Sequence, residues 1–117
     1  MARRIHLGMP FWSFDEWQGS LYPADSRPAD YLSQYARVFS AVEGNTTFYA
    51  VPSARTVETW DRVTAPDFRF CFKLPRTITH DALLHDVGQE TAAFLERMRP
   101  LGDRLGPIMI QLPPSFG

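Results

Sequence analysis

Apolar residues recur along the chain at two spacings, one typical of strands and one typical of helices. Four short apolar or alternating runs predict strands, and three runs with apolar residues three and four positions apart predict helices. The predicted strands cover residues 4–9, 41–49, 68–74 and 108–112, and the predicted helices cover residues 28–39, 54–63 and 89–99. This alternating order predicts an α/β fold with a parallel sheet, because each helix carries the chain back to the same edge.

The ends of these elements are marked by residues with restricted or special backbone chemistry. Pro28 stands at a tolerated first-turn position of the first helix, and Ser53 is expected to cap the second. Pro66 stops the second helix, Pro100 ends or kinks the third, and Gly106-Pro107 is expected to break the chain before the last strand. Residues 75–88 form a long connection with a short helical turn.

The stretch Ala41–Pro52 holds an acid and an amide two residues apart. In a strand, Glu43, Asn45 and Thr47 point to one face, because successive side chains alternate. A carboxylate placed inside an apolar strand is costly unless something pairs with it. Glu43 is therefore either a member of a structural ion pair or part of a site.

The chain contains eleven arginines and a single lysine, Lys73. This lysine ends the predicted strand 68–74, in which Phe70 and Phe72 share one face while Cys71 and Lys73 share the other. Lysine carries a compact ammonium group whose pKa shifts on burial, and arginine cannot replace it in that role. The single lysine is therefore a candidate functional residue. The alternatives are chance and a side chain that extends to solvent.

Composition describes one ordinary domain and excludes several classes of partner. The 117 residues are 44% hydrophobic, and twelve basic against thirteen acidic residues give a formal net charge of -1. This balance lacks the basic surface of a nucleic-acid-binding protein. The chain contains no apolar run of roughly 18 residues, the minimum for a membrane span.

A single cysteine, Cys71, excludes an internal disulfide and a multi-cysteine metal site. This usage fits a reducing compartment, which indicates a cytoplasmic protein. No glycine-rich dinucleotide or phosphate-binding loop follows a predicted strand, and no G-x-S-x-G sequence occurs, so no cofactor and no serine nucleophile are predicted.

An aromatic segment, residues 11–22, follows the first predicted strand. It contains Phe11, Trp12, Phe14, Trp17 and Tyr22. Aromatic side chains mostly bury area, so these residues are expected to cap the core. The alternative is a stacking surface for a planar or sugar ligand.

Several short motifs together resemble the YecE-like proteins, a family of unknown function with a TIM-barrel fold. The matching motifs are Gly8, Trp12, Trp17-x-Gly19-x-x-Tyr22-Pro23, Glu43-x-Asn45-Thr46-Thr47-Phe48-Tyr49-x-x-Pro52, Trp60, Phe70-x-Phe72-Lys73, Ile78-Thr79-His80, Gly106-Pro107 and Gln111-Leu112-Pro113-Pro114-x-Phe116. Their order and spacing cover nearly the whole chain. The resemblance implies parallel βα repeats and makes residues 1–117 a single partial domain, the N-terminal half of a TIM-type barrel.

Two features depart from the family pattern. Gly44 stands where the family usually has an aliphatic residue, and glycine weakens a strand by roughly 0.5–1 kcal/mol. A complete barrel takes about 250 residues, so this chain resembles only the first four strands. The expected partner is therefore a missing C-terminal half or a second copy in a homodimer.

The resemblance places a ligand site at the carboxyl ends of the strands, where TIM barrels bind their substrates. Glu43, Lys73 and His80 are the candidate catalytic residues, as acid, base or electrostatic groups. Substrate binding is expected from Trp12, Trp17, Tyr22, Asn45, Thr79 and Gln111. We expect Glu43, Asn45, Lys73 and Gln111 to face one side of a sheet ordered 1-2-3-4. Too few suitable ligands converge for a metal site.

Two functions from different classes remain open. The first is an enzyme that acts on a small polar ligand, sugar-like or phosphorylated, at this edge of the sheet. The second is a non-catalytic module that binds a ligand or nucleic acid through the aromatic segment 11–22, with the polar residues only orienting it. A Lys73–Glu43 ion pair would also be compatible with a purely structural role.

Overall fold

The computed structural model describes residues 5–116. Arg4, the first residue of the strand predicted over 4–9, and Gly117 lie outside the described residues. Four strands form one parallel sheet in the order β1-β2-β3-β4. The strands are β1 (Gly8–Met9), β2 (Ala41–Gly44), β3 (Arg69–Lys73) and β4 (Leu105–Met109). The predicted α/β class and sequential strand order are confirmed.

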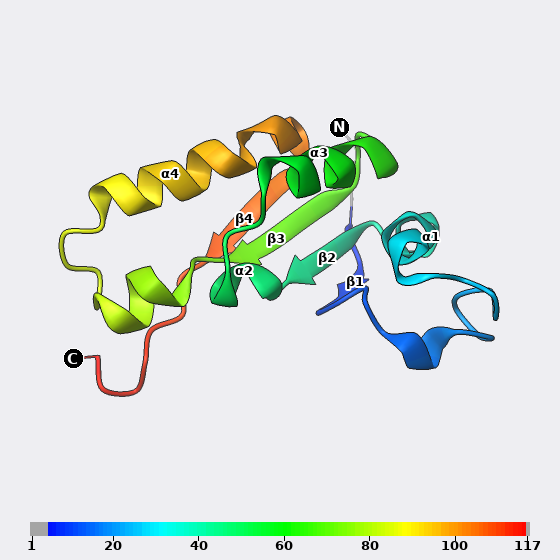
Figure 1. The fold of residues 1–117 in the computed structure, drawn as a ribbon, viewed down its shortest axis with the longest axis horizontal. Helices are drawn as coiled ribbons and strands as arrows, with labels where there is room; N and C mark the ends of the chain where they lie inside the picture. Colours follow the sequence, from blue (N-terminus) through cyan, green and yellow to red (C-terminus); the bar gives the residue numbers. More distant parts are fainter. Residues whose placement is uncertain (1–4, 117) are drawn as a thin grey trace.

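Within residues 5–116, four α-helices and four 3-10 or π-helical segments connect these strands. The α-helices are α1 (Tyr31–Val38), α2 (Thr46–Tyr49), α3 (Ala54–Val63) and α4 (Gly88–Met98). The other segments are η1 (Asp15–Trp17), η2 (Pro28–Asp30), the π-helical η3 (Thr77–Asp81) and η4 (Arg99–Arg104). Helices α3 and α4 lie along one face of the sheet (Figure 1).

The three long helices form where the sequence predicts them. Ser53 caps α3, because its hydroxyl accepts a hydrogen bond from the Thr56 amide. Pro28 begins η2 directly before α1, and α4 ends at Met98, before Pro100. The cap and the prolines thus set the predicted boundaries to within a few residues.

The core lies between the sheet and the helices that cover it. Val42, Phe70 and Phe72 extend from the strands into this layer and are almost completely buried. The helices contribute Tyr31, Leu32, Tyr35, Val57, Trp60, Phe94 and Met98. Glu43 and Cys71, which alternate with these strand residues, are half-buried on the opposite face.

The strand predicted over residues 41–49 is wrong beyond Gly44. Asn45 adopts a helical backbone conformation, and Thr46–Tyr49 form the short helix α2. The Thr47 hydroxyl explains this turn, because it lies 3.2 Å from the Gly44 carbonyl and 2.7 Å from the Lys73 carbonyl. It therefore folds the chain back onto the end of β3. Asn45 and Thr47 do not extend the alternation that includes Glu43.

The strand predicted over residues 108–112 is also shifted, because β4 runs from Leu105 to Met109. Gly106-Pro107 lies inside the strand instead of breaking the chain before it. Proline is tolerated here since β4 is an edge strand and needs no second hydrogen-bonded neighbour. A Cβ atom at Gly106 would lie 3.1 Å from the Phe70 carbonyl, so the glycine allows β4 to approach β3.

Candidate functional site

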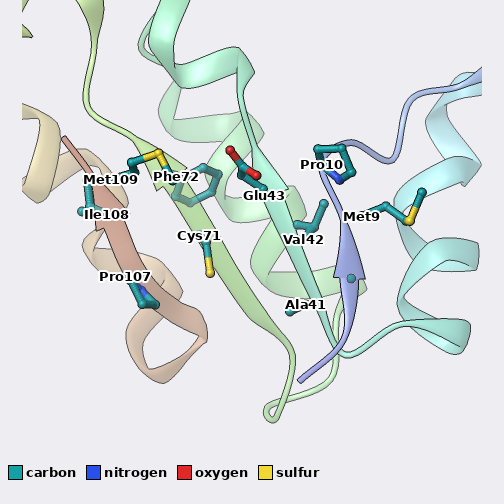
Figure 2. A pocket seen from close by; sticks show the side chains of 11 residues that line it. Met9, Pro10, Ala41, Val42, Glu43, Cys71, Phe72, Pro107, Ile108 and Met109 are labelled. Atoms are coloured by element: carbon teal, nitrogen blue, oxygen red, sulfur yellow. The ribbon is translucent and has the colours of Figure 1, made fainter. Parts of the chain in front are cut away.

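All four strands border a hollow on the face of the sheet that α3 and α4 do not cover. The hollow has a volume of about 660 Å³, and its wall is formed mainly by apolar side chains. Among the described residues, Glu43 is the only charged one in this wall (Figure 2). The Glu43 carboxylate makes no hydrogen bond and no ion pair with any residue in the range 5–116. An acid without a partner in apolar surroundings is expected to bind a donor.

Glu43 acts on the thiol across the sheet. Cys71 is the register partner of Glu43 in the β2–β3 pair and lines the same hollow. Burial, and to a lesser extent the negative charge of Glu43, raises the pKa of the Cys71 thiol. The thiol therefore stays protonated at neutral pH, and Cys71 is a poor nucleophile there.

Alkylation by iodoacetamide measures this pKa directly. Because a raised pKa lowers the thiolate fraction at a given pH, we expect Cys71 to react more slowly in the folded chain than in the chain unfolded with urea. Glu43→Gln removes the negative charge and should shift the rate profile to lower pH, whereas Glu58→Gln, on the exposed side of α3, should leave it unchanged. Identical profiles for wild type and Glu43→Gln would contradict this coupling.

Lys73 and His80 meet at one aromatic ring. The Lys73 ammonium lies 5.9 Å from the centre of the Phe48 ring, and the His80 ring packs edge-on against Phe48 with 5.0 Å between centres. His80 Nδ1 lies 2.8 Å from the Thr79 hydroxyl, so Nε2 is the nitrogen left for a ligand. Phe48 belongs to α2, and the strand predicted over residues 41–49 does not indicate that its ring lies beside Lys73 and His80.

Lys73 and Glu43 do not form the ion pair that a structural role would require. Neither an ion pair nor a hydrogen bond joins them in the described structure. Alternation along β3 places Lys73 on the same face as Cys71, and thus on the side of the sheet that carries Glu43. The acid and the ammonium therefore share a face and are not paired with one another.

Thr47 joins the two parts of this site. Its side chain is completely buried, and its hydroxyl contacts the backbone of both β2 and β3 at their carboxyl ends. These contacts fix α2, which carries Phe48, beside Lys73. Thr47 is therefore a positioning residue that the strand interpretation of residues 41–49 concealed.

Replacement of Thr47 by valine should lower the free energy of unfolding by about 1–3 kcal/mol, since it leaves buried carbonyl groups without a donor. Thr46→Val is the matched control, because Thr46 is exposed on the same helix and its replacement should change stability by less than about 0.5 kcal/mol. Urea denaturation of both variants provides the comparison. Equal midpoints would show that the Thr47 hydroxyl does not hold α2.

The sequence and the fold together identify the family of this chain. The model of the family described as "Protein of unknown function DUF72" matches residues 6–117. The chain belongs to the DUF72 family. This finding confirms the YecE-like resemblance of the sequence motifs.

Two bacterial UPF0759 proteins are similar to this chain. It is 43% identical over 113 residues to the UPF0759 protein YecE of Escherichia coli K12, which covers 97% of this chain and 39% of the relative. It is 28% identical over 118 residues to the UPF0759 protein YunF of Bacillus subtilis, and this match covers 96% of this chain and 41% of the relative. The chain thus spans about two fifths of the length of these relatives.

Solved DUF72 structures show the same arrangement of elements. A DUF72 family protein from Thermotoga maritima matches with a TM-score of 0.77 at 34% identity, covering 95% of this chain and 45% of that protein. A DUF72 family protein from Enterococcus faecalis matches with a TM-score of 0.72 at 28% identity, and the match covers 97% of this chain and 42% of that protein. The four-stranded α/β arrangement therefore corresponds to part of a longer DUF72 protein.

Three residues of the aromatic segment 11–22 serve as packing residues in this DUF72 chain. Trp12 packs edge-on against Trp60, and Trp17 packs against Tyr22 and Tyr35. Tyr22 is completely buried and donates a hydrogen bond to the Trp12 carbonyl, so it has no exposed ring face. Burial first, then the neighbouring tyrosines, raises the pKa of Tyr22 to about 12.

The remaining predicted binding residues are separated by the structure. Asn45 follows β2 directly and donates from Nδ2 to the Pro10 carbonyl at 3.3 Å. Thr79 is buried, with its hydroxyl directed at His80. Gln111 lies in the exposed segment after β4 and outside the wall of the hollow, because the strand ends at Met109. The predicted common face therefore includes Glu43 and Lys73 but not Gln111.

Within residues 5–116, no three His, Cys, Asp or Glu side chains come together as a metal-binding group. No helix in the same range is long and apolar enough to cross a membrane.

Proposed function

We propose that the carboxyl ends of β2 and β3 form part of an enzyme active site for a small polar molecule, sugar-like or phosphorylated. The observation that carries this proposal is the Glu43 carboxylate, which borders an apolar hollow of about 660 Å³ and has no partner within residues 5–116. A carboxylate in this position accepts a hydrogen bond or a proton from a bound molecule.

Lys73 and His80 supply the complementary chemistry in this proposal. The ammonium of Lys73 donates hydrogen bonds and carries positive charge, and the free Nε2 of His80 donates or accepts a proton. Both groups contact Phe48, at the end of the sheet toward which Glu43 also lies. The Glu43 carboxylate and the nitrogen groups of Lys73 and His80 are not paired with one another. This arrangement leaves them available for acid–base chemistry, whereas a structural ion pair would occupy them.

The site is proposed to belong to a TIM-type barrel that further strands complete. The sheet order β1-β2-β3-β4 is that of consecutive βα units, and the DUF72 relatives are more than twice as long as this chain. In such barrels the substrate lies over the carboxyl ends of the strands, where Glu43 and Lys73 are found.

Thermal unfolding in the presence of glucose, glucosamine 6-phosphate and glycerol 3-phosphate tests the proposal. A ligand that binds the folded chain at one hundred times its Kd adds about 2.7 kcal/mol to the free energy of unfolding. We expect at least one of these compounds to raise Tm by several degrees and Glu43→Gln to abolish this increase. Glu58→Gln is the control and should retain it.

The proposal fails if none of the three compounds changes Tm. It also fails if Glu43→Gln, with an unchanged Tm in the absence of ligand, responds to the compounds as the wild type does. The second outcome would place the binding site away from the hollow.

A further inference from the structure

A second, smaller cavity also borders Glu43. It has a volume of about 120 Å³ and lies between the loop after β1, residues 10–13, and the end of β2, residues 43–46. Glu43 lines both this cavity and the larger hollow. The two spaces therefore share one carboxylate.

The Asn45 side chain, which belongs to the wall of this cavity, holds an unsatisfied acceptor just behind the cavity surface. Its Nδ2 donates to the Pro10 carbonyl, so the opposite orientation would set two oxygens against each other. The Oδ1 atom is thus fixed as the free end of the amide. It is buried and has no hydrogen-bond partner among the described residues. Buried acceptors are normally satisfied, so this atom indicates a missing donor.

No residue in the cavity wall carries a positive charge. The wall consists of residues 10–13 and 43–46, which contain no lysine, arginine or histidine. Lys73, the nearest cation along the adjacent strand, lies over the Phe48 ring and is not part of the wall. The wall therefore contains an acidic residue, Glu43, and an amide, Asn45, but no cation of its own.

We infer that this cavity takes the protonated amine of the ligand. An ammonium group donates several hydrogen bonds, and its positive charge would pair with the Glu43 carboxylate. The aromatic residues Phe11 and Trp12 in the wall also favour a cation over an anion. The cavity is much smaller than the hollow, about 120 Å³ against about 660 Å³, which suits one end group of a ligand and not the whole molecule. The inference rests on the proposed function, because both use Glu43.

The ligand class that follows is a small amino alcohol or an amino sugar. Its amine enters the small cavity, and its remaining polar groups lie in the larger hollow toward Lys73 and His80. This narrows the proposed substrate class from polar molecules in general to those with a primary amine.

Three probes of nearly equal size and different charge test the inference. Ethanolamine is cationic, ethylene glycol is neutral and glycolate is anionic. In ¹H–¹⁵N NMR titrations of the full chain, the Asn45 side-chain amide and the Trp12 indole NH report on the cavity from its wall. We expect ethanolamine to shift both signals saturably, ethylene glycol to bind at least tenfold more weakly, and glycolate to leave them unchanged. Glu43→Gln should weaken ethanolamine binding at least tenfold, and Glu58→Gln should not.

Each other outcome overturns the inference. If ethylene glycol or glycolate binds as tightly as ethanolamine or more tightly, the cavity does not select an amine and the inference is wrong. If Glu43→Gln then abolishes the binding of that compound, the proposed function is still supported. Ethanolamine binding that survives Glu43→Gln would remove the carboxylate from the cavity's chemistry. If no probe shifts the two NMR signals, the cavity does not bind such ligands and the inference is wrong. The proposed function is then tested separately, by the thermal unfolding experiment with the sugar and phosphate compounds. If Glu43→Gln does not fold, the wild-type ratio between ethanolamine and ethylene glycol decides the inference.

Discussion

Replacing Trp60 with alanine is expected to lower the free energy of unfolding by about 3–5 kcal/mol, the usual cost of removing a large buried aromatic side chain. Trp60 is 8% exposed and lies at the centre of an aromatic cluster. Its ring stacks on Phe70 and Phe72 with 5.8 Å and 5.4 Å between centres, and Trp12 packs edge-on against it at 5.5 Å. The replacement therefore leaves a cavity between α3 and β3 that the surrounding side chains fill only in part.

Urea denaturation monitored by circular dichroism measures this loss, and two further variants give it a scale. Trp60→Phe keeps an aromatic ring in the cluster and should cost less than Trp60→Ala. Lys73→Met should affect ligand binding more than folding, because Lys73 ends a strand and forms no ion pair within residues 5–116. If Lys73→Met unfolds the chain as readily as Trp60→Ala does, Lys73 is a structural residue.

The isolated 117-residue chain is expected to self-associate. Strands β1 and β4 are the two edges of the sheet, and each offers unpaired backbone groups on its outer side. Large apolar side chains are exposed along these edges and their extensions, namely Ile5, Leu7, Met9, Met109 and Ile110. The uncovered hollow adds an apolar surface between them. Such surfaces mark sites of association in soluble proteins.

A two-fold axis parallel to the strands offers one way to satisfy both edges together. It would place β4 of one copy beside β1 of the other, twice, and keep all strands parallel. Size-exclusion chromatography with light scattering should give a mass at least twice the 13.4 kDa of the single chain. A stable monomer at micromolar concentration, with cooperative unfolding and no binding of a dye for exposed apolar surface, would contradict the half-barrel interpretation.

The sequence predicts the order of the elements because their hydrophobic periods are unambiguous. Phe70 and Phe72 alternate with Cys71 and Lys73, and the structure buries only the two phenylalanines. The cap at Ser53 is equally local, since one hydroxyl and one amide three residues away determine it. Predictions of this kind depend on neighbouring residues alone.

Predictions that failed depend on contacts between distant residues. Residues 46–49, Thr-Thr-Phe-Tyr, are typical of a strand, but the Thr47 hydroxyl bonds to the Lys73 carbonyl, 26 residues away, and the chain turns into α2. Pro107 lies within β4 because that strand is at the edge, which its own sequence does not reveal. The misplaced end of β4 then separates Gln111 from the site.

The candidate site is predictable only in part for the same reason. Strand alternation identifies the face that carries Glu43 and Lys73, but not Phe48, which brings Lys73 and His80 together from another element. Gly44 gains its explanation only in three dimensions, because a Cβ atom there would lie 2.6 Å from the Phe72 ring. The glycine that weakens the strand in isolation thus makes room for a core aromatic side chain.

Footprinting at Cys71 tests most directly whether the hollow beside Glu43 is the ligand site. Cys71 is the only cysteine in the chain and lines the hollow, so iodoacetamide reports on this position alone. A compound that raises Tm should also slow the alkylation of Cys71 in proportion to its occupancy, and Glu43→Gln should remove both effects. A compound that raises Tm while the alkylation rate of Cys71 stays unchanged would show that ligands bind elsewhere on this chain.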